Sequence, residues 1–149
     1  MGRVIAFDVN ETLLDMGALD PHFERAFGSA AVREQWFGQM LQLAFVGGLT
    51  GRYVDFGAAQ RAALAMLAER HGVEVDVEEI VGAMSALPPH DDVPEALDAL
   101  RAAGLPLAAL TNSTLAVAEA QLRSAAARRP RRRSARGRRP DRAARRLDD

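Results

Sequence analysis

A short apolar run that ends in an aspartate constrains the fold of this chain more than any other feature. Residues 4–7 (Val-Ile-Ala-Phe) read as a buried β-strand, and Asp8 follows directly, ahead of a polar turn that contains Thr12. In open α/β sheets, ligands bind at the carboxyl ends of the strands. The pattern therefore predicts a reactive carboxylate at a sheet edge. The alternative is that Asp8 only caps a turn or a helix.

A second strand-like run precedes another group of polar side chains. Residues 105–110 (Leu-Pro-Leu-Ala-Ala-Leu) read as a further buried strand, which ends in Thr111, Asn112 and Ser113. We expect this strand to be the second strand of the same core.

Together these segments resemble a known family. The stretch from Asp8 to Leu13 resembles motif I of the haloacid dehalogenase superfamily, and residues 111–113 resemble its motif II. Residues 7–15 and 51–56 are similar to the type II 2-haloacid dehalogenase branch. The resemblance covers about residues 3–125. It implies an α/β fold, with an incomplete Rossmannoid parallel-sheet core and an all-helical cap inserted between the two motifs.

The resemblance also implies a division of the chain. Residues 1–15 and 93–123 would form the N-terminal half of the core, and residues 16–92 would form the cap. Apolar spacing and capping residues predict the helices. The predicted helices cover 19–27, 31–46 (ended by Gly47-Gly48), 56–71 (capped by Asp55, ended by Gly72), a segment after Asp76, a segment from Pro94, and 115–123.

The family's chemistry assigns a role to each motif residue. Enzymes of this kind use the aspartate corresponding to Asp8 as a nucleophile, which forms an ester and divides one difficult displacement into two steps. Thr12 would orient that carboxylate by a hydrogen bond. Thr111 and Asn112 would donate to the carboxylate or phosphate of the substrate. The resemblance implies three further substrate-binding positions, which are Val9, Asn10 and Phe37.

Asn10 helps to choose between two reactions. Phosphatases of this superfamily carry a second aspartate at this position, which protonates the leaving group, and an amide cannot do so. A halide leaves without a proton. Asn10 therefore favours a dehalogenase over a magnesium-dependent phosphatase, although the dehalogenase branch usually has an aromatic residue there.

Phe37 departs from the dehalogenase pattern in another way. It stands where those enzymes supply an arginine that holds the halide and the substrate carboxylate, and a phenylalanine ring donates no hydrogen bond to an anion. Arg33 lies one helical turn away, and we consider the hypothesis that it reaches in instead. Trp36 and Phe37 either line the mouth of the site or belong to the core of the cap.

Composition limits the remaining classes. The chain has no cysteine, so disulfides and thiolate metal sites are excluded. No apolar run approaches the roughly 20 residues of a membrane span, and no signal-peptide pattern opens the chain. We expect a cytoplasmic protein that acts on a small acidic substrate without a cofactor; Mg²⁺ would be needed only for phosphatase chemistry. The resemblance leaves a homodimer open.

The C-terminal segment differs sharply in charge. Residues 1–123 carry 17 acidic and 8 arginine side chains, whereas residues 124–149 carry 11 arginines and 3 aspartates. The segment is predicted to be disordered because it has little apolar surface to bury. It reads either as a basic arm for nucleic acid, which we do not favour, or as a frameshifted or truncated end. The family's lysine and later acidic motifs are absent, so we expect an inactive, marginally stable fragment.

Overall fold

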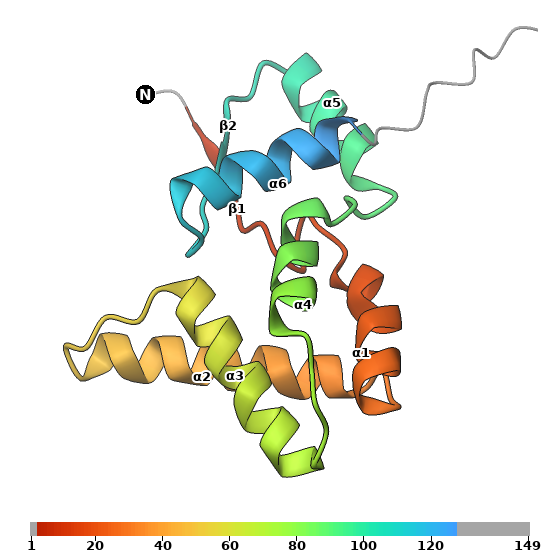
Figure 1. The fold of residues 1–149 in the computed structure, drawn as a ribbon. Coiled ribbons are helices and arrows are strands. Elements are labelled where there is room, and N and C mark those ends of the chain that lie inside the picture. The colour runs from red at the N-terminus through yellow and green to blue at the C-terminus, as the bar shows by residue number, and fades with distance from the viewer. Residues whose placement is uncertain (1–2, 128–149) are drawn as a thin grey trace, which may run out of the picture.

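The computed structural model describes residues 3–127 and shows a helix-rich α/β arrangement. Figure 1 shows the strands with α5 and α6 at one end of the molecule and α1 to α4 at the other. We use "cap" for residues 16–92. The elements are β1 (Ile5–Phe7), η1 (Met16–Leu19), α1 (Asp20–Phe27), α2 (Val32–Leu49), α3 (Phe56–His71), α4 (Val77–Ala83), η2 (Met84–Ala86), α5 (Val93–Ala102), β2 (Leu107–Ala109) and α6 (Leu115–Ala127).

The two predicted strands pair with each other in parallel. Ile5 lies opposite Leu107 and Phe7 lies opposite Ala109. The N–H of Leu110 donates to the carbonyl oxygen of Phe7 at 2.8 Å and extends the pairing beyond β2. Because the strands run in the same direction and in register, the polar residues that follow each strand emerge at the same edge of the sheet.

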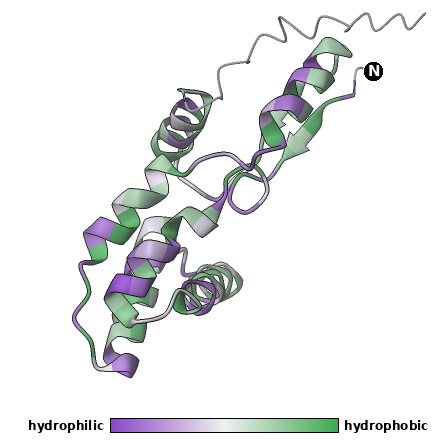
Figure 2. Cartoon of the chain, turned by 90° about the vertical axis from the view of Figure 1, so that its right-hand side faces the viewer, coloured by the Kyte–Doolittle hydropathy of each residue, from purple (hydrophilic) through white to green (hydrophobic). Residues whose placement is uncertain are grey.

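The prediction that both strands are buried is wrong. Neither β1 nor β2 contains a buried residue, although Figure 2 colours the strand beside the N-terminus mainly as hydrophobic. The flanking Val4 and Leu110 are 61% and 70% exposed. Within residues 3–127 the sheet has two strands, and a two-stranded ribbon is too narrow to enclose its own side chains.

The loop after β1 is a compact turn tied to the end of the cap. The carbonyl oxygen of Val9 accepts the N–H groups of Leu13 and Leu14, both at 2.9 Å. The N–H of His90 donates to the carbonyl oxygen of Leu13 at 3.1 Å. Glu11 has a φ of 62°, a left-handed conformation that costs a non-glycine residue energy and that the surrounding contacts must hold.

Local capping signals in the cap are confirmed. The Asp55 carboxylate accepts the N–H of Ala58 at 3.0 Å at the start of α3, and Asp76 accepts that of Glu79 at 3.0 Å at the start of α4. Gly72 ends α3 with a φ of 65°. A carboxylate three residues before a free N–H defines the start of each of these helices. A glycine in the left-handed conformation defines the end of α3.

The predicted end of α2 at Gly47-Gly48 is wrong, because the helix continues to Leu49. The N–H of Arg52 donates to the carbonyl oxygen of Gly47 at 2.8 Å as the chain folds back. A Cβ added at Gly47 would lie 2.5 Å from the carbonyl oxygen of Arg52. Glycine at this position permits a close approach of backbone rather than stopping the helix.

Large buried side chains gather in the cap. The rings of Phe23 and Trp36 lie 5.3 Å apart, and Trp36 Nε1 donates to the carbonyl oxygen of Gln60 at 3.1 Å. Both aromatic residues have 0% exposure. Trp36 therefore belongs to the core of the cap, which settles one of the two alternatives left open for it.

The final helix is longer than expected. α6 continues to Ala127 rather than ending at Arg123, so residues 124–127 of the predicted tail are its last turn. Alanine favours the helix, and Ala125 packs against the hydrophobic core with 9% exposure. The rest of the arginine-rich segment, together with the nucleic-acid and frameshift hypotheses for it, lies outside the described residues.

Candidate active site

Asp8 and Thr12 meet at the carboxyl end of β1. Both side chains are exposed, and Thr12 Oγ1 donates a hydrogen bond to Asp8 Oδ2 at 3.2 Å. The turn between them brings the hydroxyl back over the carboxylate. One oxygen of Asp8 is held in this way, and a nucleophilic carboxylate needs its other oxygen directed at the substrate.

The second motif faces the cap. Thr111 and Ser113 are partly buried, and Thr111 Oγ1 accepts the N–H of Ser113 at 3.2 Å. Residues 111–113 line a cavity of about 420 Å³. The cap residues that complete this cavity are Ala44, Phe45, Gly48, Tyr53, Val54 and Phe56. The strand-end hydroxyl and amide groups therefore open onto a space between core and cap that they share with apolar side chains of the cap.

A second cavity adjoins the first. It has a volume of about 380 Å³ and shares Phe56 and Ser113 with its neighbour. Its polar wall includes Arg61, whose guanidinium donates two hydrogen bonds to the Glu78 carboxylate at 2.7 and 2.9 Å. The cleft between cap and core thus extends to both sides of Phe56.

Val9 and Asn10 lie inside the loop after β1. Val9 has 0% exposure and Asn10 has 8%. Asn10 Oδ1 accepts a hydrogen bond from Gln121 Nε2 at 3.1 Å. Gln121 is not among the residues predicted from the sequence to belong to the site. The only signal is its place between Ala118 and Ala125 on the buried face of α6, a spacing typical of one helix face.

Phe37 and Arg33 take positions in the cap. Phe37 is partly buried against the hydrophobic core and is not among the residues that line the 420 Å³ cavity. Arg33, with a side chain only 15% exposed, donates to Asp20 at 2.6 Å and to Glu11 at 3.0 Å. The hypothesis that Arg33 reaches to a substrate is therefore opposed by two carboxylates that already hold it.

The ion pairs of Arg33 also fix its charge. Burial acts to lower the pKa of Arg33, but the hydrogen bond to Asp20 and the charges of Asp20 and Glu11 outweigh it, and the pKa is raised. Arg33 stays cationic and joins the loop after β1 to the start of α1 and to α2. It thereby supports the strained backbone at Glu11.

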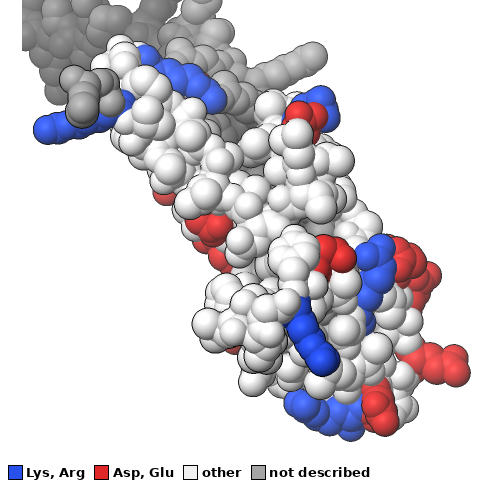
Figure 3. All heavy atoms as spheres, turned by 90° about the vertical axis from the view of Figure 1, so that its left-hand side faces the viewer, with Lys and Arg blue, Asp and Glu red and all other residues white. Residues whose placement is uncertain are grey.

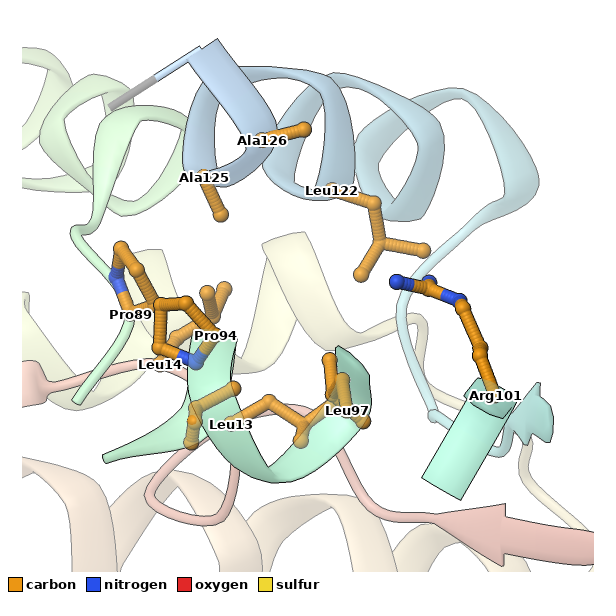
Figure 4. A pocket seen from close by; sticks show the side chains of 10 residues that line it. Leu13, Leu14, Pro89, Pro94, Leu97, Arg101, Leu122, Ala125 and Ala126 are labelled. Carbon is orange, nitrogen blue, oxygen red and sulfur yellow. The ribbon is translucent and has the colours of Figure 1, made fainter. Parts of the chain in front are cut away.

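Figure 4 shows a third cavity, of about 200 Å³, behind the loop. Leu13 and Leu14 of the loop meet Leu97 of α5 and Leu122 of α6 around it, and Arg101 lies at one side. None of the predicted site residues lines it. It is a packing space between α5, α6 and the loop.

Residues 3–127 lack both a metal-binding cluster and a helix suited to crossing a membrane. No cluster of three or more histidine, cysteine, aspartate or glutamate side chains there is arranged to hold a metal ion. None of the helices in this range combines the length and apolar character of a membrane span.

Comparison with known proteins agrees with this geometry. Residues 3–130 match the family described as haloacid dehalogenase-like hydrolase. An (S)-2-haloacid dehalogenase of Pseudomonas putida is 30% identical over 115 residues, which are 74% of this chain and 51% of that enzyme. The L-2-haloacid dehalogenase structure from Xanthobacter autotrophicus superposes with a TM-score of 0.76 at 30% identity, covering 85% of this chain and 53% of that one.

The two parallel strands, with Asp8 after the first of them and an all-helical segment between them, define a helix-rich α/β protein with the fold of the haloacid dehalogenases. This chain belongs to the haloacid dehalogenase-like hydrolase family. The predicted family and fold class are confirmed, and the relatives named above are hydrolases of carbon–halide bonds. The chain spans about half the length of the curated relatives it matches.

Proposed function

We propose that Asp8 is the nucleophile of a 2-haloacid dehalogenase-like reaction. One Asp8 carboxylate oxygen attacks the halogen-bearing carbon, a C–O bond forms, and the halide leaves with the electron pair of the C–X bond. In a complete dehalogenase cycle, water would then hydrolyse the ester, release the 2-hydroxy acid and a proton, and restore the aspartate. The observation that carries the proposal is the exposed Asp8 carboxylate at the end of β1, held through one oxygen by Thr12 at 3.2 Å.

The cavity beside residues 111–113 suits a small acid. The hydroxyl of Thr111 and the amide of Asn112 would donate to its carboxylate, while Tyr53 and Phe56 would face its apolar part. Val9 and Asn10 would shape the loop that carries the nucleophile. A Xanthobacter autotrophicus relative, 27% identical, is described with chloropropionic acid covalently bound, which supports ester formation in the family.

Phe37 has the least support among the proposed substrate contacts. Its partly buried position on α2 packs against the hydrophobic core. The proposal that Phe37 contacts the substrate rests on its place in the family pattern. The reaction as written needs no cofactor. The division into core and cap, the cytoplasmic location and the homodimer remain predictions from the sequence.

Trapping the ester tests the proposal. After incubation with 2-chloropropionate, mass spectrometry should find one adduct on Asp8, and Asp8→Asn should form none. Asp91→Asn, which changes an exposed aspartate outside the site, is the matched control and should form the adduct as the parent does. An adduct that persists in Asp8→Asn, or none in the parent chain, refutes the proposal.

Release of the product is a separate question. The sequence contains no lysine to hold charge at the nucleophile, so we propose that this 149-residue chain is alkylated once rather than turning over. Halide release should then stop near one equivalent per chain. Steady release beyond that would show that the chain hydrolyses its ester, and Mg²⁺-dependent release of phosphate from a phosphate ester would favour the phosphatase alternative.

A further inference from the structure

Gln121 joins three segments that are far apart in the sequence. Its side chain has 0% exposure, and Nε2 donates to Asn10 Oδ1 at 3.1 Å and to the carbonyl oxygen of Met84 at 2.9 Å. Asn10 lies two residues after Asp8, and Met84 lies in η2, where the cap returns to the core. Figure 1 shows α6 beside the loop after β1 and beside η2, the short turn that follows α4.

These two hydrogen bonds fix the orientation of both amides. A glutamine NH₂ group has two hydrogens, and each has an acceptor here. Asn10 must present its oxygen to Gln121, so its own NH₂ group points away from α6. The Asn10 side chain is therefore held in one orientation inside the loop.

The side-chain oxygen of Gln121, Oε1, indicates that packing alone does not explain why a glutamine occupies this position. Among the described residues, Gln121 Oε1 is buried without a hydrogen-bond partner. A buried acceptor without a partner is unfavourable, and each such group in a native structure calls for a specific reason. A leucine would fill a similar space without burying an unpartnered oxygen, but it would remove the hydrogen bond that holds the Asn10 side chain.

We propose that Gln121 is a positioning residue for the nucleophile. It holds Asn10, and through Asn10 the turn in which Val9 accepts the N–H groups of Leu13 and Leu14. Thr12 reaches Asp8 from this same turn, so the placement of the carboxylate depends on the turn keeping its shape. The catalytic consequence rests on the proposed function, whereas the holding of the turn does not.

Hydrogen exchange tests the holding of the turn without any substrate. In Gln121→Leu, the protection of the Leu13 and Leu14 amides should fall about tenfold through local opening. The amide of Val73, which donates to the carbonyl oxygen of Ala68 at 3.0 Å in the cap, should keep its protection. No change at Leu13 and Leu14, or an equal loss at Val73, overturns the proposal.

The rate of Asp8 alkylation by 2-chloropropionate tests the chemical consequence. Gln121→Leu should lower the saturating rate about tenfold and leave the half-saturating concentration unchanged, because only the nucleophile is displaced. Gln121→Glu should not restore the rate, since a carboxylate cannot donate to the two acceptors. Gln42→Leu, at an exposed position on α2, is the matched control and should react as the parent does.

A double variant separates this role from general support of the fold. If Gln121 acts through Asn10, Asn10→Ala combined with Gln121→Leu should be no slower than the slower single variant, whereas independent effects would multiply. Multiplied effects overturn the proposal. If the parent chain forms no adduct, the proposed function fails, and the exchange measurement alone decides the role of Gln121.

Discussion

The cap and the strand-bearing part of the chain differ in how they bury side chains. In the cap, Phe23, Trp36 and Leu64 have 0% exposure. In the strand-bearing part, β1, β2 and α5 contain no buried residue, and α6 buries only Ala118, Gln121 and Ala125. The residues that carry the proposed chemistry thus lie on the less buried part, while the cap supplies most of the hydrophobic core.

This difference shows which contacts hold the loop after β1 in place. The loop after β1 has only a narrow sheet behind it, yet Val9 and Leu14 are almost fully buried. Gln121 and Arg33 reach the loop from α6 and from α2. The site is therefore held by specific polar contacts as much as by the sheet.

The largest expected effect on the free energy of unfolding tests the contrast between the cap and the strand-bearing part. Trp36→Ala should lower the free energy of unfolding by about 3–5 kcal/mol, because it removes a fully buried aromatic ring and leaves a cavity. Leu110→Ala, at a position 70% exposed beside β2, should change it by no more than about 0.5 kcal/mol. Urea unfolding measures both. Similar losses for the two variants would contradict the contrast between cap and strands.

A smaller effect tests whether close packing extends to the end of α2. Gly47→Ala should lower the free energy of unfolding by about 1–3 kcal/mol, since its Cβ would meet the backbone oxygen of Arg52 at 2.5 Å. Gly48→Ala is the matched control. Its Cβ meets nothing within 4 Å, so it should stabilise the helix by roughly 0.5–1 kcal/mol. Thermal unfolding distinguishes the two, and a stabilised Gly47→Ala would refute the close approach.

The smallest effect concerns the charged surface of the cap. Figure 3 shows acidic and basic side chains interleaved at this end of the molecule. The hydrogen bond from Arg61 lowers the pKa of Glu78, and those from Arg25 and then His22 lower the pKa of Glu79. A lowered folded-state pKa gives stability that is present above the ordinary value of 4.5 and is lost as the pH falls through the folded value.

We therefore expect a modest loss of cap stability below pH 4.5, small because both carboxylates are exposed. The urea midpoint measured at neutral pH and at about pH 3 checks this. A double variant, Glu78→Gln with Glu79→Gln, should lose less between the two pH values than the parent chain does. Equal losses would show that these pairs contribute nothing.

Features defined by neighbouring residues could be predicted from the sequence. The strand that precedes Asp8, the caps Asp55 and Asp76 and the stop at Gly72 depend on groups within a few residues. The end of α2 could not be predicted in this way. A glycine stops a helix or admits a close neighbour depending on what lies beside it, and at Gly47 that neighbour is a later part of the chain.

The sequence by itself determined the family and the order of the two motifs, because each motif is a short stretch that follows a strand. The contact between Thr12 and Asp8 followed from the resemblance to that family, and the structure contains it. Only the tertiary structure decided the partners of Asn10, Arg33 and Trp36. The bond between Gln121 and Asn10 joins residues 111 positions apart. Such a pair depends on how distant segments pack, since a buried donor takes whichever acceptor the fold brings within reach.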